Sequence, residues 1–369
     1  MGLYDDATHD LFGFGGSFGS SFGGGFGGGI IPLNHQDHSL LGQEFLLSDS
    51  GALSPISFAG SSGTQGSTTT HTTVVAPGPT LVTGAGSNLS IDLVWDTSVA
   101  GAPSGFTSAI INAAQTYASD FTTPLKTVVY IAVGWGEING TSLASNALGE
   151  SESAGYLTNY ATVAGALGKD GYTFHAANEP TSGQFFLTSA EAKGMGLVSG
   201  TGGGTRSVDG YVGFSTLTGT GDSWSFGAGA TATQFNMQSV ASHEISEVMG
   251  RIAMEGTAVY YGKKTYTPLD LFNYNSQSVL ELSGGGGYFS ANNGVSHMGN
   301  FNQATIYGGD IGDWASYLSP SQSGTVASGS SDAFDAFTRP GYGVSVSADD
   351  LLEVAALGYK LTPLGSLLA

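Results

Sequence analysis

The residues best suited to chemistry lie in segment 242–251, which reads Ser-His-Glu-Ile-Ser-Glu-Val-Met-Gly-Arg. In the H-E-x-x-H pattern, two histidines one helical turn apart bind zinc, and the glutamate between them is the general base for the water on the metal. Here Glu247 replaces the second histidine. His243 and Glu247 are four positions apart and share one face of a helix, so an imidazole and a carboxylate could bind a metal together. Glu244 keeps the position of the base.

The composition is that of a folded, acidic protein. Hydrophobic residues make up 40% of the 369 positions, which is ample for a core. The formal net charge is -20, and the nine Lys and Arg residues are scattered along the chain. Without a basic stripe we expect no nucleic-acid partner. No long uninterrupted apolar run is present, and we therefore expect no membrane span.

The chain has no cysteine, so a transition metal must be bound by His, Asp, Glu or Tyr. The first basic residue is Lys126, and the N-terminus therefore lacks the basic region of a secretory signal. Acidic, Gly-rich, cysteine-free chains nevertheless resemble bacterial extracellular proteins. We expect a secreted protein that is exported without an N-terminal signal peptide, and the apolar tail 361–369 is compatible with an uncleaved C-terminal signal.

The composition changes near residue 80. We expect a low-complexity head and linker rich in Gly, Phe and Ser over residues 1–80, and a folded domain over residues 81–369 whose C-terminal part, from about 255, is rich in turns. Glycine dominates the head and disfavours regular structure there. The head is either a spacer or a segment through which the chain self-associates.

Hydrophobic periodicity predicts the elements around the motif. Apolar or alternating runs predict strands at 89–95, at 127–135 and, near a sheet edge, at 209–215. Helical spacing predicts helices at 105–121, more weakly at 151–167, and at 234–249, where Gly250 ends the helix. Asn293-Gly294 predicts a hairpin, and a capping box of Ser347 and Asp350 predicts the start of a final helix.

This order of elements resembles the catalytic half of zincin metalloproteases, specifically the metzincin branch. The motif helix, with segments 267–274, 299–302 and 312–315, also resembles a family of bacterial secreted metalloproteases in which these segments recur in this order. The resemblance covers roughly residues 89–359. It implies an α+β fold with a mixed twisted sheet and long helices. It also implies an extracellular zinc peptidase that acts on a protein or peptide substrate, in which Glu244 deprotonates the zinc-activated water that attacks the peptide carbonyl.

The third metal ligand departs from the metzincin pattern, because Ala253 occupies the position of the third histidine. Asp270 is the leading replacement, since its Pro-Leu-Asp-Leu-Phe-Asn-Tyr segment follows the helix where metzincins place the turn beneath the metal. Tyr274 resembles the displaceable tyrosine ligand of some metzincins. Glu255 and His297 are alternatives for the third ligand. The acidic pairs Asp310 with Asp313 and Asp332 with Asp335 could bind calcium or simply cap loops.

Each of these residues also has a simpler role. Glu247 could pair with Arg251 on the helix surface, which contributes about 0.3–0.5 kcal/mol. His243 could be a core histidine and Glu244 an ordinary acid. The alternative hypothesis is therefore a catalytically inert, zincin-like extracellular protein with a structural or self-assembling role.

Overall fold

The computed structural model describes residues 31–32, 54–56, 76–144, 147–202, 208–284, 286–307, 309–315, 332–343 and 345–368. Most of the expected head and its linker at 61–73 lie outside these residues. Two short strands from this region pair with the folded domain: β1 (Ile31–Pro32) pairs with β20 (Phe337–Thr338), and β2 (Ser54–Ile56) pairs with β10 (Gly155–Asn159). The five-stranded sheet described next begins with β3 (Thr80–Thr83).

A five-stranded mixed sheet has the order β3-β4-β6-β12-β9. Its parallel strands are β4 (Leu89–Trp95), β6 (Thr127–Trp135) and β12 (Gly210–Phe214). The strands β3 and β9 (Gly149–Ser153) run antiparallel at the two ends of this order. The predicted strands at 89–95 and 127–135 are confirmed. Strand β6 lies between two others and its inward side chains are buried, as its continuous apolar run predicts.

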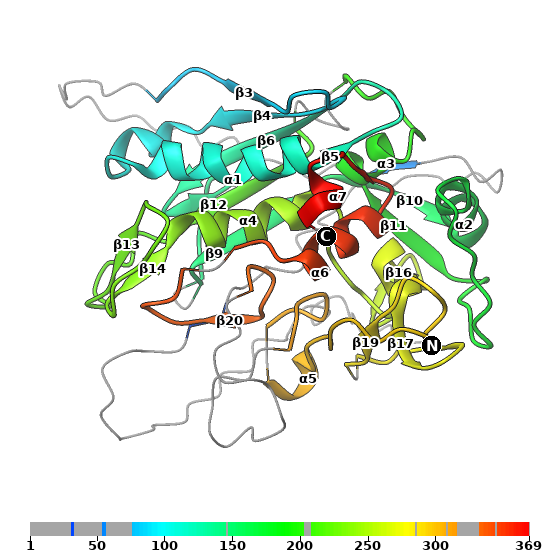
Figure 1. Ribbon diagram of the computed structural model, residues 1–369. Helices are drawn as coiled ribbons and strands as arrows, with labels where there is room; N and C mark the ends of the chain where they lie inside the picture. Colours follow the sequence, from blue (N-terminus) through cyan, green and yellow to red (C-terminus); the bar gives the residue numbers. More distant parts are fainter. Residues whose placement is uncertain are drawn as a thin grey trace, which may run out of the picture.

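Two long helices pack on this sheet and on each other. Helix α1 (Phe106–Asp120) contacts β3 and β4, and helix α4 (Met237–Val248) contacts β9 and β12. In Figure 1 they lie next to each other, with α1 in cyan and α4 in yellow-green. A buried hydrogen bond joins them, because the Tyr117 hydroxyl donates to the Ser242 carbonyl at 2.6 Å. The motif helix is thus fixed between the sheet and α1.

One prediction in this region is wrong. The first half of 151–167 is not helical: β9 and β10 pair with neighbouring strands, and only α2 (Tyr160–Lys169) is a helix. Strand pairing prevails there over a weak helical period. The strand predicted near a sheet edge at 209–215 is present as β12, which lies between β6 and the last strand of the sheet, β9.

A second sheet and several short elements complete the fold. This sheet has the order β15-β16-β11-β10-β2, and includes β11 (Gln184–Thr188), β15 (Ala258–Tyr260) and β16 (Lys263–Tyr266). The remaining short elements are η1 (Thr97–Gly101), β5 (Phe121–Thr122), β7 (Glu137–Ile138), β8 (Thr141–Ser142), α3 (Ser189–Gly194), β13 (Ser223–Ser225), β14 (Gln234–Asn236), η2 (Pro268–Phe272), β17 (Asn273–Ser276), β18 (Val279–Leu280), β19 (Tyr288–Phe289), α5 (Ala304–Tyr307), α6 (Ala348–Ala356), β21 (Lys360–Leu361) and α7 (Gly365–Leu368).

The C-terminal part is built mainly from turns, short strands and short helices. Asn293 and Gly294 both have positive φ, and the chain turns back there so that Phe289 exchanges backbone hydrogen bonds with Met298 and Gly299. The capping box of Ser347 and Asp350 is present at the start of α6. The architecture is a mixed α+β fold. Among the described residues, no helix has the length and apolar character needed to span a membrane.

Candidate metal centre

Helix α4 is capped and anchored at both ends. The Asn236 side chain accepts a hydrogen bond from the Ser239 backbone N–H at 2.9 Å, which satisfies one of the unpaired donors of the first turn. At the other end, Gly250 has a φ of 120° and reverses the chain. The Tyr359 hydroxyl donates to the Met249 carbonyl at 3.0 Å. These contacts fix the side chains on the last two turns of the helix.

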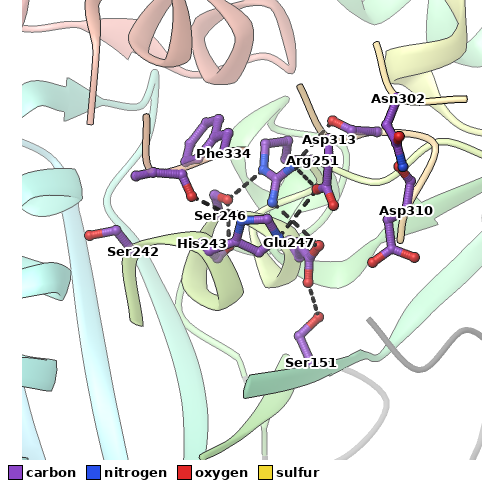
Figure 2. A network of polar contacts seen from close by, with 12 residues as sticks. Ser151, Ser242, His243, Ser246, Glu247, Arg251, Asn302, Asp310, Asp313 and Phe334 are labelled. Atoms are coloured by element: carbon purple, nitrogen blue, oxygen red, sulfur yellow. Dashed lines mark hydrogen bonds and ion pairs between the residues drawn. The ribbon is translucent and has the colours of Figure 1, made fainter. Parts of the chain in front are cut away.

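Three side chains meet beside these turns and form what we call the ligand cluster: His243, Glu247 and Asp313 (Figure 2). The Nε2 atom of His243 lies 3.2 Å from Glu247 Oε1 and 3.2 Å from Asp313 Oδ1. All three side chains are at most 1% exposed. Among the described residues, this is the one group of three His, Asp or Glu side chains with ligand atoms close enough to hold a metal ion.

The ligand cluster has the donor chemistry of a transition-metal site. Two ligands about 2.1 Å from a tetrahedral metal are roughly 3.4 Å apart, close to the separations seen here. A backbone carbonyl can only accept, so the Nδ1 atom of His243 must donate to the Ala333 carbonyl at 2.9 Å. When the imidazole is neutral, Nε2 carries the lone pair that a metal needs, in the tautomer typical of metal-ligating histidines.

Arg251 joins the two carboxylates of the ligand cluster. Its Nη1 donates to Asp313 Oδ1 at 2.7 Å and its Nη2 to Glu247 Oε1 at 3.3 Å. The guanidinium is also held by Ser246 Oγ and the Gly312 carbonyl, and it lies 4.4 Å from the centre of the Phe334 ring. Carboxylate ligands of metals are commonly supported by such outer hydrogen bonds. Each carboxylate oxygen has a second lone pair, so these bonds leave room for a metal.

The segment that carries Asp313 is held by contacts distant in sequence. The indole nitrogen of Trp314 donates to Asp350 Oδ1 on α6 at 2.7 Å. The Asp313 carbonyl accepts from the Asn302 backbone N–H, and the Trp314 backbone N–H donates to the Phe334 carbonyl, each at 2.8 Å. Ser151 on β9 supports the other carboxylate, because its hydroxyl donates to Glu247 Oε2 at 2.8 Å.

Burial and the neighbouring carboxylates have opposite effects on the pKa values of the cationic side chains at this site. Burial and Arg251 both lower the pKa of His243, but Asp313 and Glu247 outweigh them and hold it well above its usual value. Burial likewise lowers the pKa of Arg251, whereas Asp313, Glu247 and Glu353 raise it, so that the guanidinium stays charged. Two cations, His243 and Arg251, therefore face two carboxylates in a buried cluster.

Glu244 lies next to His243 on α4 and is fully buried. Its carboxyl packs against β9 so closely that a Cβ atom at Gly149 would be 2.5 Å from Glu244 Oε1. A residue larger than glycine at position 149 would therefore require the Glu244 side chain or the strand to shift. The candidate base is therefore positioned by the same strand that carries Ser151.

Asp270 is not part of the ligand cluster, and the prediction that it is the third ligand is wrong. Its carboxylate accepts hydrogen bonds from the backbone N–H groups of Met254, Glu255 and Thr267. Glu255, the first alternative, accepts from the Asn273 amide and the Gly284 backbone N–H. We call Glu255 and Asp270 the turn cluster. Their hydrogen bonds brace the chain after α4, which explains their burial without a metal.

The other predicted residues lie elsewhere. The Tyr274 hydroxyl is 3.4 Å from Asn293 Oδ1, and burial together with Glu179 and Tyr288 raises its pKa to about 12. No contact among the described residues joins it to the ligand cluster, so its predicted ligand role is not supported. His297 is exposed, stacks on Tyr288 and lies 2.7 Å from Asn300 Oδ1. Asp332 Oδ1 accepts from the Phe334 backbone N–H and caps its loop.

Asp313 is the ligand candidate that the sequence reasoning missed. Its Gly-Asp-Trp-Ala segment carries part of the family resemblance, but the sequence alone predicts calcium binding or loop capping for this aspartate. The available signal is a charged residue in a segment that contributes to this resemblance and lies far from the helix in sequence. Comparisons of the chain with protein-family models, with curated proteins and with solved structures find no match.

Proposed function

We propose that the chain is an extracellular metal-dependent peptidase in which His243, Glu247 and Asp313 bind zinc and Glu244 is the general base. The observation that carries this proposal is the convergence of three ligand atoms on one point. Two carboxylate oxygens lie 3.2 Å from a histidine nitrogen whose partner nitrogen is already hydrogen-bonded. The choice of a peptide bond as substrate, and the extracellular location, rest on the resemblance of the motif helix and its associated segments to secreted metalloproteases.

Zinc at this site would supply a Lewis acid for the substrate carbonyl and an acidic water. The protein's own contribution is to hold the ligands and to move the proton. Glu244 is one residue from His243 on the same helix turn and is fixed against Gly149. A carboxylate held in this way can take a proton from the attacking water and return it to the leaving amine. Ser151 and Arg251 orient the two ligand carboxylates.

The direct test is casein hydrolysis by the purified full chain loaded with zinc. Because general acid–base catalysis contributes about 10²–10⁴-fold, Glu244→Gln should lose roughly that factor in turnover while keeping its zinc. Glu191→Gln is the matched control. Glu191 is also fully buried on a short helix, and glutamine is accepted at its capping-box position. Equal turnover in Glu244→Gln and wild type would remove Glu244 as the base.

A second candidate function is the inert zincin-like scaffold, and one observation favours it. The guanidinium of Arg251 already compensates both carboxylates of the ligand cluster inside a fully buried site. On this account the cluster is a structural ion network. A purified chain that binds no stoichiometric zinc, and whose sedimentation coefficient rises with concentration, would favour a self-assembling protein over a peptidase.

A further inference from the structure

The chain contains two Asn-Gly dipeptides, Asn139-Gly140 and Asn293-Gly294. Residues in this order can react with each other. The backbone nitrogen of the glycine loses its proton and attacks the side-chain carbonyl carbon of the asparagine, and the side-chain amide leaves as ammonia. Water then adds to the resulting succinimide ring and opens it to aspartate or isoaspartate. Glycine favours the reaction, because no Cβ shields its nitrogen and its backbone is the most permissive.

Asn139-Gly140 is the loop of a small exposed hairpin. The strands β7 and β8 pair over two residues each and form a sheet of their own. Asn139 has a φ of 50° and Gly140 a φ of 78°, as a two-residue Asn-Gly loop requires. Both residues are exposed, and a Cβ added at Gly140 would have no atom within 4 Å. So short a hairpin is marginally stable and opens easily, which lets the reacting atoms meet.

Asn293-Gly294 is packed into the fold instead. The Oδ1 atom of Asn293 accepts a hydrogen bond from the His175 backbone N–H at 3.1 Å. Gly294 is buried, and its N–H donates to Ser290 Oγ at 3.1 Å. A Cβ added at Gly294 would lie 2.8 Å from the Ser276 carbonyl oxygen. The attacking nitrogen and the side chain that it must reach are both held, so this turn has to open further before they can react.

We propose that Asn139 is a site of spontaneous modification, at which the folded protein converts asparagine into aspartate or isoaspartate, and that the fold protects Asn293 from the same reaction. The proposal does not depend on the candidate metal centre. It is carried by the exposure and open space at one Asn-Gly pair and the packing and hydrogen bonds of the other.

The modification changes a contact with β9. Asn139 Nδ2 donates to Glu152 Oε2 on this strand at 3.0 Å. The product has a carboxylate in place of this donor, and neighbouring like charges destabilise a sheet. Isoaspartate also adds a backbone carbon to a loop whose length sets the register of the hairpin. The reaction therefore loosens the hairpin next to the strand that carries Ser151.

The test follows both Asn-Gly sites by peptide mapping and mass spectrometry while the full chain is incubated at mildly alkaline pH. In the folded protein, Asn139 should be converted at least about tenfold faster than Asn293, because the packed turn costs more free energy to open. In guanidinium chloride the two sites should react at similar rates. Asn139→Gln should abolish the early mass gain, since its longer side chain cyclises much more slowly. Asn293→Gln is the matched control and should retain the mass gain.

Two results would overturn the proposal. One is an equal rate at both sites in the folded protein. The other is a slow Asn293 in guanidinium chloride, because local sequence and not the fold would then explain the difference. The effect on the hairpin has its own readout: the melting temperature of wild type should fall during the incubation, and that of Asn139→Gln should not. A constant melting temperature with Asn139 converted would contradict the loosening of the hairpin.

Discussion

Two buried acidic clusters are formed by α4 and the residues that follow it. They differ in the groups that pair with their carboxylates. In the turn cluster, Asp270 accepts three backbone N–H bonds and Glu255 accepts a backbone and an amide N–H. In the ligand cluster, two carboxylates face a histidine nitrogen and an arginine. Backbone donors make the first cluster a brace for a turn. In the second cluster the carboxylates are paired with charged side chains, and a bound cation could take over this pairing. The second cluster is therefore a candidate site for a cation.

The largest expected effect concerns Arg251→Met. Without metal, loss of this buried cation leaves Glu247 and Asp313 poorly compensated, and the free energy of unfolding should fall by about 3–5 kcal/mol. Zinc should restore much of this loss, because it can replace the missing charge, and should stabilise the variant more than it stabilises wild type. Urea denaturation with and without zinc measures both values. A variant that zinc does not recover would argue for a purely structural ion network.

The turn cluster should respond to pH rather than to metal. Burial raises the pKa of Asp270 from 3.8 to about 7, so the folded protein keeps a proton that the unfolded chain loses between these values. Its contribution to stability is complete below pH 3.8 and declines as the pH rises to about 7, by about 1.4 kcal/mol per pH unit at most.

Asp270→Asn should remove the part of the pH-dependent loss of stability that is due to Asp270. The measurement is the free energy of unfolding of the variant and of wild type, by urea denaturation, between pH 4.5 and 7. An unchanged pH slope would show that Asp270 is ionised throughout.

The smallest effect is expected at Ser151, which supports the ligand cluster from β9. Loss of an outer hydrogen bond to a metal ligand commonly costs 10–100-fold in affinity, and Ser151→Ala should lie near tenfold. Ser153→Ala is the matched control, because its hydroxyl contacts the backbone carbonyl of Glu247 at 3.4 Å and not the carboxylate. Zinc titration of both variants measures the difference. Equal affinities would separate Ser151 from metal binding.

The residues of one helix were predictable because their geometry is local. His243 and Glu247 share a face at a spacing of four, and α4 ends at the glycine that predicts its end. Asp313 was not predictable in this way. Its position depends on hydrogen bonds of its own segment to Asn302, Phe334 and Asp350, which no periodicity encodes.

Tertiary contacts that no sequence periodicity encodes also explain the wrong predictions. The segment 151–159 has a weak helical period, but pairing of β9 and β10 with distant strands makes it extended. Asp270 lies where the resemblance places the turn beneath the metal, yet its oxygens accept hydrogen bonds from three backbone N–H groups. Sequence patterns indicated which residues could do chemistry, and tertiary contacts determine which of them meet.

The most direct test is the zinc content of three full-length proteins after dialysis against zinc and gel filtration: wild type, Asp313→Asn and Asp270→Asn. The account predicts one zinc per chain in wild type and in Asp270→Asn, and none in Asp313→Asn, with circular dichroism confirming that each protein is folded. Zinc retained by Asp313→Asn, or lost from Asp270→Asn, would contradict the ligand cluster as the metal centre.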